Sequence, residues 1–200
     1  MKNKMFKDIR PLLEQEFGAE TAESILKLAE QKFDKLCADH ADEPKAVKAQ
    51  THNNMYPCIS LYWSLQEKGV EPPKALDFLD KSWSKMAEPK AASIRTLLKI
   101  PGLYKLMPAI FKFVTLKQFG ETAGFQAKFY DMGKGRCKFD MTKCLFCDLC
   151  KKNGCPELVP CFCHTDDVTD GNMHPKLLWN RTKVMGEGGN VCDFDLIVKK

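Results

Sequence analysis

The segment FQAKFYDMGKGRCKFDM, residues 125–141, decides the fold class because its apolar side chains alternate with polar ones. Alternation with a period of two is typical of a strand that buries one face. Gly133-Lys134-Gly135 separates the two alternating runs, and glycines allow the tight turn of a hairpin. We therefore predict a β-hairpin over this segment.

A second hairpin is predicted at the end of the chain. One strand is expected over 178–184, and a loop at 186–190 leads to a strand over 192–198. The apolar face of this last strand holds Cys192, Phe194, Leu196 and Val198, with Asp193 and Asp195 on the other face. Between the hairpins, 142–152 and 156–167 predict two helices.

The first 120 residues predict helices instead. Apolar residues recur at helical spacing from Ile25 to Leu36, and a second helix is expected over 45–68, before Gly69. A third begins at Pro72, and 94–119 predicts two short helices with a kink or turn at its prolines.

We therefore expect an α+β fold in a single domain, 1–200. The helical half, 1–120, would pack on a C-terminal antiparallel sheet, and this sheet would be built from two β-hairpins flanking two helices. The order expected over 121–200 is β-β-α-α-β-β. With 44% hydrophobic residues, including 13 Phe, the chain can fill such a core.

The charge of the chain is unevenly distributed. The net charge is +5, but six basic residues and no acidic residue fall between Lys90 and Gly120, so the remainder is nearly neutral. This distribution argues against a nucleic-acid partner. No stretch has 18 uncharged apolar residues, so no transmembrane segment is expected. For 94–119 we favour core helices with extended lysines over peripheral attachment to a membrane.

Ten cysteines are the compositional anomaly. Residues 1–10, MKNKMFKDIR, lack the apolar run of a secretory signal, so reduced thiols and a cytoplasmic location are expected. Cys144, Cys147, Cys150 and Cys155 have a spacing one residue longer than a ferredoxin motif. A metal or iron–sulfur site there, or a zinc site drawing on Cys161, Cys163 and His164, is one alternative. We favour helix packing for these cysteines and expect no cofactor.

Two further patterns suggest chemistry. Cys163 and Asp166 are three residues apart and share a helical face, which is usable as an acid, base or nucleophile pair. The alternative is an ordinary helix end with a solvated aspartate. Arg181 can form a cross-strand ion pair with Asp193 or bind a substrate carboxylate through its planar fork.

The C-terminal motifs resemble those of the L-2-amino-thiazoline-4-carboxylic acid hydrolases. They are C-x-x-D at 163–166, R-T at 181–182 and GGNVCDF at 188–194, together with Cys144 followed by GCPEL at 154–158. The resemblance implies opening of a thiazoline ring by hydrolysis to N-carbamoyl-L-cysteine, a step in bacterial cysteine formation. A non-catalytic small-molecule-binding or sensor domain is the alternative.

That reaction needs a base, an acid and a cation for the substrate carboxylate. We expect Asp166 to be the base or its orienter, Cys163 the acid or nucleophile, and Arg181 the carboxylate clamp. The residues expected to bind the substrate are Cys144, Cys192, Asp193 and His164. The expected partner is a small molecule, and a homodimer is possible.

Overall fold

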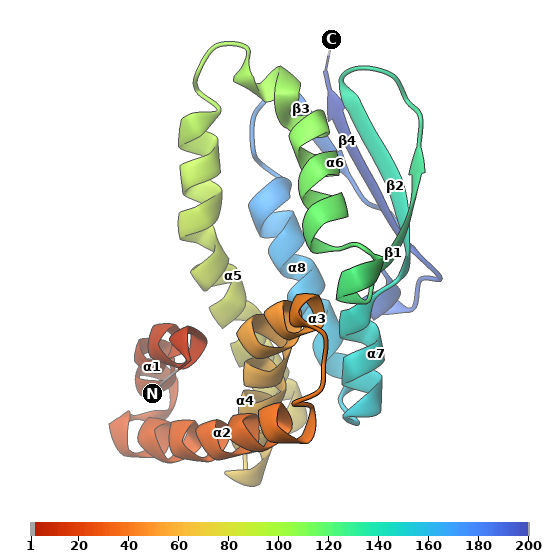
Figure 1. The fold of residues 1–200 in the computed structure, drawn as a ribbon. Coiled ribbons are helices and arrows are strands. Elements are labelled where there is room, and N and C mark those ends of the chain that lie inside the picture. The colour runs from red at the N-terminus through yellow and green to blue at the C-terminus, as the bar shows by residue number, and fades with distance from the viewer. Residues whose placement is uncertain (1–2, 200) are drawn as a thin grey trace.

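Four antiparallel strands form one sheet at the C-terminal end of the computed structural model, which describes residues 3–199 (Figure 1). The strands are β1 (Gln126–Tyr130), β2 (Arg136–Lys143), β3 (Leu177–Asn180) and β4 (Cys192–Val198). Their order in the sheet is β1-β2-β4-β3. Each hairpin therefore contributes two neighbouring strands, and the β2–β4 pairing joins the hairpins in the middle of the sheet.

Helices make up the N-terminal half and the connection between the hairpins. The first half contains α1 (Lys4–Phe17), α2 (Ala19–Asp39), α3 (Lys45–Gln50), η1 (Thr51–Met55), α4 (Tyr56–Glu67), α5 (Pro72–Leu97), η2 (Leu103–Leu106), α6 (Met107–Gln118) and η3 (Glu121–Ala123). The second half contains α7 (Leu145–Lys152), η4 (Pro156–Leu158), α8 (Val159–Asp170) and η5 (Met185–Glu187). The α+β class and the two hairpins flanking two helices are confirmed.

The largest apolar cluster is centred on α4. This helix is buried on nearly all sides, and Ile59, Leu61 and Leu65 are completely inaccessible to solvent. The same cluster includes Phe139 of β2 and Cys150 of α7, so it is continuous from the helical half into the sheet half. Figure 1 shows α5 as the long helix that runs from this helical layer up beside α8.

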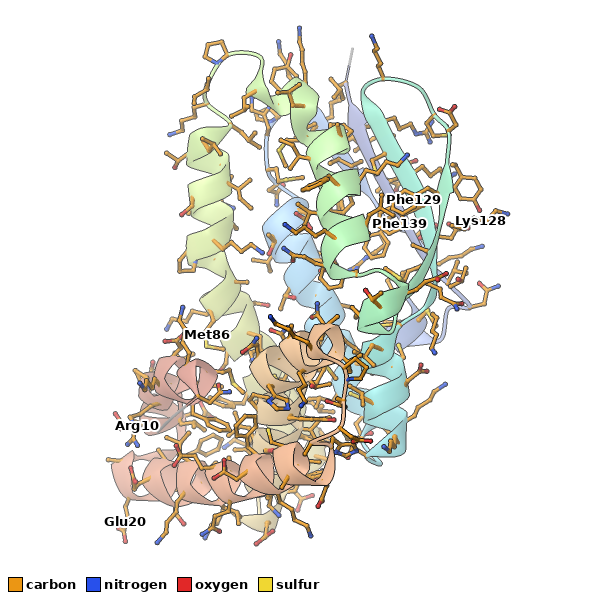
Figure 2. All side chains as sticks on the ribbon, in the orientation of Figure 1. Arg10, Glu20, Met86, Lys128, Phe129 and Phe139 are labelled. Atoms are coloured by element: carbon orange, nitrogen blue, oxygen red, sulfur yellow. The ribbon has the colours of Figure 1, made fainter. Side chains whose placement is uncertain are left out.

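Aromatic rings fill the space between α6 and the sheet. Phe139 of β2 lies between Phe129 of β1 and Phe194 of β4, with centroid distances of 4.8 Å on each side. Phe111 of α6 covers this row at 5.8 Å from Phe139. Figure 2 shows Phe129 and Phe139 close together beside α6, while Lys128 projects away from them. The apolar residues that alternate along the first hairpin are thus those on the sheet face that α6 covers.

The first strand of the second hairpin differs from its prediction. β3 ends at Asn180 rather than 184, and its buried face begins at Leu177, whereas Leu178 is 44% exposed. A shift of one residue along a strand exchanges its two faces. Residues 181–184 leave the ladder because Asp193 accepts hydrogen bonds from the amides of Thr182 and Lys183, which takes the place of strand pairing.

Three helix boundaries are also corrected. The predicted 45–68 helix contains the π-helical turn η1, and the predicted 142–152 helix begins only at Leu145 because β2 continues to Lys143. Ile94 lies inside α5 rather than at the start of a short helix. Pro108 occupies the first turn of α6, where its missing N–H costs nothing, so it starts the helix instead of kinking it.

The predicted core role of 94–119 holds for only one side of the segment. Leu98 is 1% exposed and packs with Met173, Leu177 and Leu196. By contrast, Leu106 is 56% exposed and Ile110 is 41% exposed. No helix among residues 3–199 is long and apolar enough to cross a membrane.

Candidate functional site

The candidate site is organised by Arg181, which extends from the end of β3 to α8. Its Nη1 donates to Oδ2 of Asp166 at 3.0 Å, and its Nη2 donates to Oδ2 of Asp167 at 2.6 Å. Nη2 also donates to the carbonyl oxygen of Cys163 at 2.9 Å. The arginine side chain is 3% exposed, and its guanidinium carbon lies 5.5 Å from the centroid of Phe194. The sequence motifs around 163–166 and 181 therefore meet in space.

Two carboxyl groups of α8 have pKa values that are raised toward neutral pH. Burial raises the pKa of Asp166 to about 6, with Arg181 acting against this shift and Asp167 adding to it. Its side chain is nevertheless 45% exposed, so the carboxyl group is packed among protein atoms on one side and accessible to solvent on the other. Burial and the nearby Asp166 raise the pKa of Asp170 to about 7. Two carboxyls thus change charge in the range where proton transfer is useful.

The Cys163 thiol is kept protonated. Burial raises its pKa, and the negative charge of Asp166 raises it further. Gly186 of η5 makes this close packing possible, because a Cβ atom there would lie 3.1 Å from Sγ of Cys163. Cys192 follows in the same region: its Sγ accepts a hydrogen bond from the Met185 amide at 3.2 Å, and burial raises its pKa to about 11.

Cys144 has the opposite character. It is the N-cap residue of α7 and is only partly buried. The Cys147 thiol lowers the pKa of Cys144 by hydrogen bonding to its sulfur, and the amides of Cys147 and Phe146 at the helix start act in the same direction. The Cys144 side chain nevertheless forms no capping hydrogen bond with the first turn of α7. Cys144, Cys163 and Cys192 are close enough to influence one another electrostatically, so the structure brings these three predicted residues together.

Two other predicted site residues make contacts elsewhere. Asp193 accepts hydrogen bonds from Thr182 and Lys183, which lower its pKa although burial opposes them. It does not pair with Arg181 but anchors the segment that carries it. His164 contacts Asp80 of α5 at 2.7 Å and Glu187 of η5 at 3.3 Å. Burial lowers the pKa of His164, but these two carboxylates produce a net rise.

Helical geometry explains the separation of His164. At about 100° per residue, it projects on roughly the opposite side of α8 from Asp166. It therefore links α8 to α5 and η5 through these contacts and lies on the other side of the helix from Asp166.

Asp170, a weaker acid or base candidate from the sequence, and Lys90, which had no predicted role, also lie at the site. Asp170 lies one helical turn after Asp166, and this i,i+4 spacing was a usable signal in the sequence. Lys90 of α5 is exposed, and its positive charge lowers the pKa of both aspartates. No sequence signal identifies Lys90, because only the packing of α5 along α8 brings it there.

The cysteine run 144–155 is built into helix and core. All ten cysteines are free thiols, and Cys147, Cys150 and Cys155 are buried. Within residues 3–199, no three His, Cys, Asp or Glu side chains are grouped so that they could hold a metal ion. The structure also has a hollow of about 300 Å³ beside α1 and α5, lined by residues such as Leu12, Lys74 and Ser82, outside the Cys163–Asp166–Arg181 cluster.

Comparison with known proteins identifies one family. The model of the family described as L-2-amino-thiazoline-4-carboxylic acid hydrolase matches residues 48–196. This range contains the whole cluster, from Cys144 through the α8 carboxyls to Arg181 and Cys192. No curated protein matches the chain.

Proposed function

The chain belongs to the L-2-amino-thiazoline-4-carboxylic acid hydrolase family, and we propose that it hydrolyses the thiazoline ring of that acid to N-carbamoyl-L-cysteine. The observation that carries this proposal is the contact between Arg181 and Asp166 beside the protonated Cys163. It supplies a carboxylate base and a thiol acid one helical turn apart on α8.

The reaction has a simple balance of atoms. The oxygen of water forms a bond to the ring carbon that lies between nitrogen and sulfur, and this carbon becomes the carbonyl of the product. The carbon–sulfur bond breaks. One hydrogen of the water ends on the ring nitrogen and the other on the released sulfur. Catalysis therefore needs a group that removes a proton from water and a group that delivers one to sulfur.

Asp166 and Cys163 fit these two needs. With a pKa of about 6, Asp166 is mostly ionised at neutral pH yet basic enough to accept a proton from water. Cys163, whose raised pKa keeps it protonated, passes its hydrogen to the departing sulfur, and the proton that Asp166 took from water returns to Cys163. Cys144 and Cys192 line the site beside them. If a covalent route is used instead of direct attack by water, we assign the nucleophile to Cys144, because its lowered pKa favours the thiolate form that attacks.

We choose the residue that binds the substrate carboxylate by comparing the exposure of Arg181 and Lys90. The Arg181 side chain is 3% exposed and already binds two carboxylates, so we propose that it positions Asp166. Lys90 is exposed on α5 and close enough to lower the pKa of Asp166 and Asp170, so its charge is available to attract an incoming carboxylate. In our proposal Lys90 therefore takes the role of clamp.

The test is incubation of the purified chain with the thiazoline acid, followed by chromatography and mass spectrometry for the product that has gained one water. Asp166→Asn and Cys163→Ser are each expected to lower kcat by about 100-fold or more. Lys90→Gln is expected to raise KM with a small effect on kcat. Cys144→Ser distinguishes the two routes, since direct attack by water does not need that thiolate.

Matched variants control for general damage. Asp148→Asn changes an exposed carboxylate of α7, and Cys37→Ser changes a partly buried thiol of α2. Both are expected to keep wild-type turnover. The proposal fails if the wild-type chain forms no product, or if Asp166→Asn and Cys163→Ser both turn over as fast as the controls.

A further inference from the structure

The outward side of α6 carries a row of large apolar side chains that face solvent. Exposure is 56% for Leu106, 41% for Ile110, 64% for Phe113 and 55% for Leu116. At 100° per residue, these four positions fall within an arc of about 120°. We call these four residues the α6 ridge. Leu97 and Ile100, which precede it in the chain, are also more than half exposed.

The opposite side of the same helix is fully used by the fold. Pro108 and Thr115 are buried, and Phe111 packs edge-to-face on Trp179 at 5.5 Å. A surface helix normally places polar residues on its outer face. Because α6 is apolar on its outer side as well, packing against the sheet does not explain the ridge.

Positive charge surrounds the ridge. Lys99, Lys105, Lys112 and Lys117 lie within or next to it in sequence, and residues 90–120 contain no Asp or Glu. Nζ of Lys117 lies 5.9 Å from the ring of Phe113, and Nζ of Lys112 lies 5.4 Å from the ring of Phe129. These exposed lysines thus hold their ammonium groups beside aromatic rings, and basic residues next to an apolar helix face are typical of helices that lie at a lipid interface.

We propose that the α6 ridge docks on the surface of a bilayer containing anionic lipid. The apolar row would enter the boundary between headgroups and acyl chains, and the lysines would contact lipid phosphates. A second copy of the chain fits less well, because two facing ridges would bring lysines against lysines with no carboxylate between them. This proposal is independent of the hydrolytic function, since no ridge residue belongs to the α8 site.

The experiment is co-sedimentation of the purified chain with vesicles of phosphatidylcholine, with or without phosphatidylglycerol, at low and high salt. We expect binding to the anionic vesicles that weakens at high salt, because salt screens the lysine–phosphate attraction. Phe113→Ser combined with Leu116→Ser is expected to lower the partition constant at least about tenfold, since two large side chains no longer enter the lipid. Lys105→Gln with Lys112→Gln is expected to reduce binding to anionic vesicles.

Leu178→Ser is the matched control, because Leu178 is 44% exposed on β3 and outside the ridge. It should bind like the wild-type chain. All variants change exposed side chains, and circular dichroism checks that each is folded. Light scattering tests whether a second copy of the chain binds to the ridge instead. Absence of sedimentation with anionic vesicles at low salt, equal binding by the ridge variant, or a dimer that the ridge variant dissociates would each overturn the proposal.

Discussion

Arg181 and Asp166 form an ion pair of 3.0 Å in which the guanidinium is buried and the carboxylate is open to water. The side chains are 3% and 45% exposed, respectively. The arginine is fixed from several directions, by Asp167, the Cys163 carbonyl and the ring of Phe194. The aspartate is therefore held through Oδ2, while its side chain remains partly exposed to solvent.

Arg181→Lys should destabilise the fold although it preserves the charge. An ammonium group lacks the planar fork that reaches Asp166, Asp167 and the Cys163 carbonyl at the same time. We expect a loss of about 1–3 kcal/mol in the free energy of unfolding, measured by urea denaturation. Arg95→Lys is the control, because Arg95 pairs with Glu88 near the surface of α5 and should cost less than about 1 kcal/mol. Equal losses in both variants would contradict the bracing role of Arg181.

Asp170→Asn should make stability less dependent on pH. The pKa of Asp170 is raised from 3.8 to about 7, so the folded chain holds a proton there that the unfolded chain releases. Its stabilising contribution is complete below about pH 4 and is lost as the pH rises through about 7. The wild-type chain should therefore lose stability across this range more steeply than the variant. Parallel curves of melting temperature against pH would refute this.

Cys144 should be the first cysteine to react with iodoacetamide at neutral pH. It is partly exposed, and its pKa is lowered by the Cys147 thiol, whereas burial raises the pKa of Cys37 to about 11. Thiolates rather than thiols are alkylated. Cys147→Ala should slow the reaction, because it removes the hydrogen bond that stabilises the thiolate. Peptide mapping by mass spectrometry gives the order, and earlier labelling of Cys37 or Cys163 would be inconsistent with this assignment.

Gly186→Ala should loosen η5 from α8. The added Cβ would lie 2.7 Å from Cγ1 of Val159, which is too close, and 3.1 Å from Sγ of Cys163, which is a tight contact. We expect a destabilisation of about 1–3 kcal/mol. Val159→Ala removes the nearer methyl group, so the double variant should lose less than the sum of the single losses. Full additivity in urea unfolding would show that the clash is not the cause.

Residues close in sequence were predicted well because their patterns are local. The alternation around Phe129 and Phe139 specified the first hairpin, and the C-x-x-D spacing placed Cys163 and Asp166 on one turn of a helix. The i,i+4 relation of Asp166 and Asp170 was equally available in the sequence. The family resemblance rested on such local motifs and is confirmed.

Relations between distant segments could not be predicted in the same way. The sequence alone does not show which face of β3 is buried, because a register shift of one residue leaves the composition of a strand unchanged but reverses its faces; in the structure Leu177 is buried and Leu178 is 44% exposed. The sequence offered Asp193 or a substrate as partners of Arg181. The structure pairs Arg181 with Asp166 and Asp167 rather than with Asp193.

The sequence by itself determined the α+β class, the two hairpins and the residues from which a site can be built, because periodicity and short spacings fix local structure. Only the tertiary structure decided which of these residues meet, which thiol has a lowered pKa and which side of α6 stays uncovered. Those outcomes depend on burial and on the field of neighbouring charges, and both arise only when segments far apart in the chain pack together.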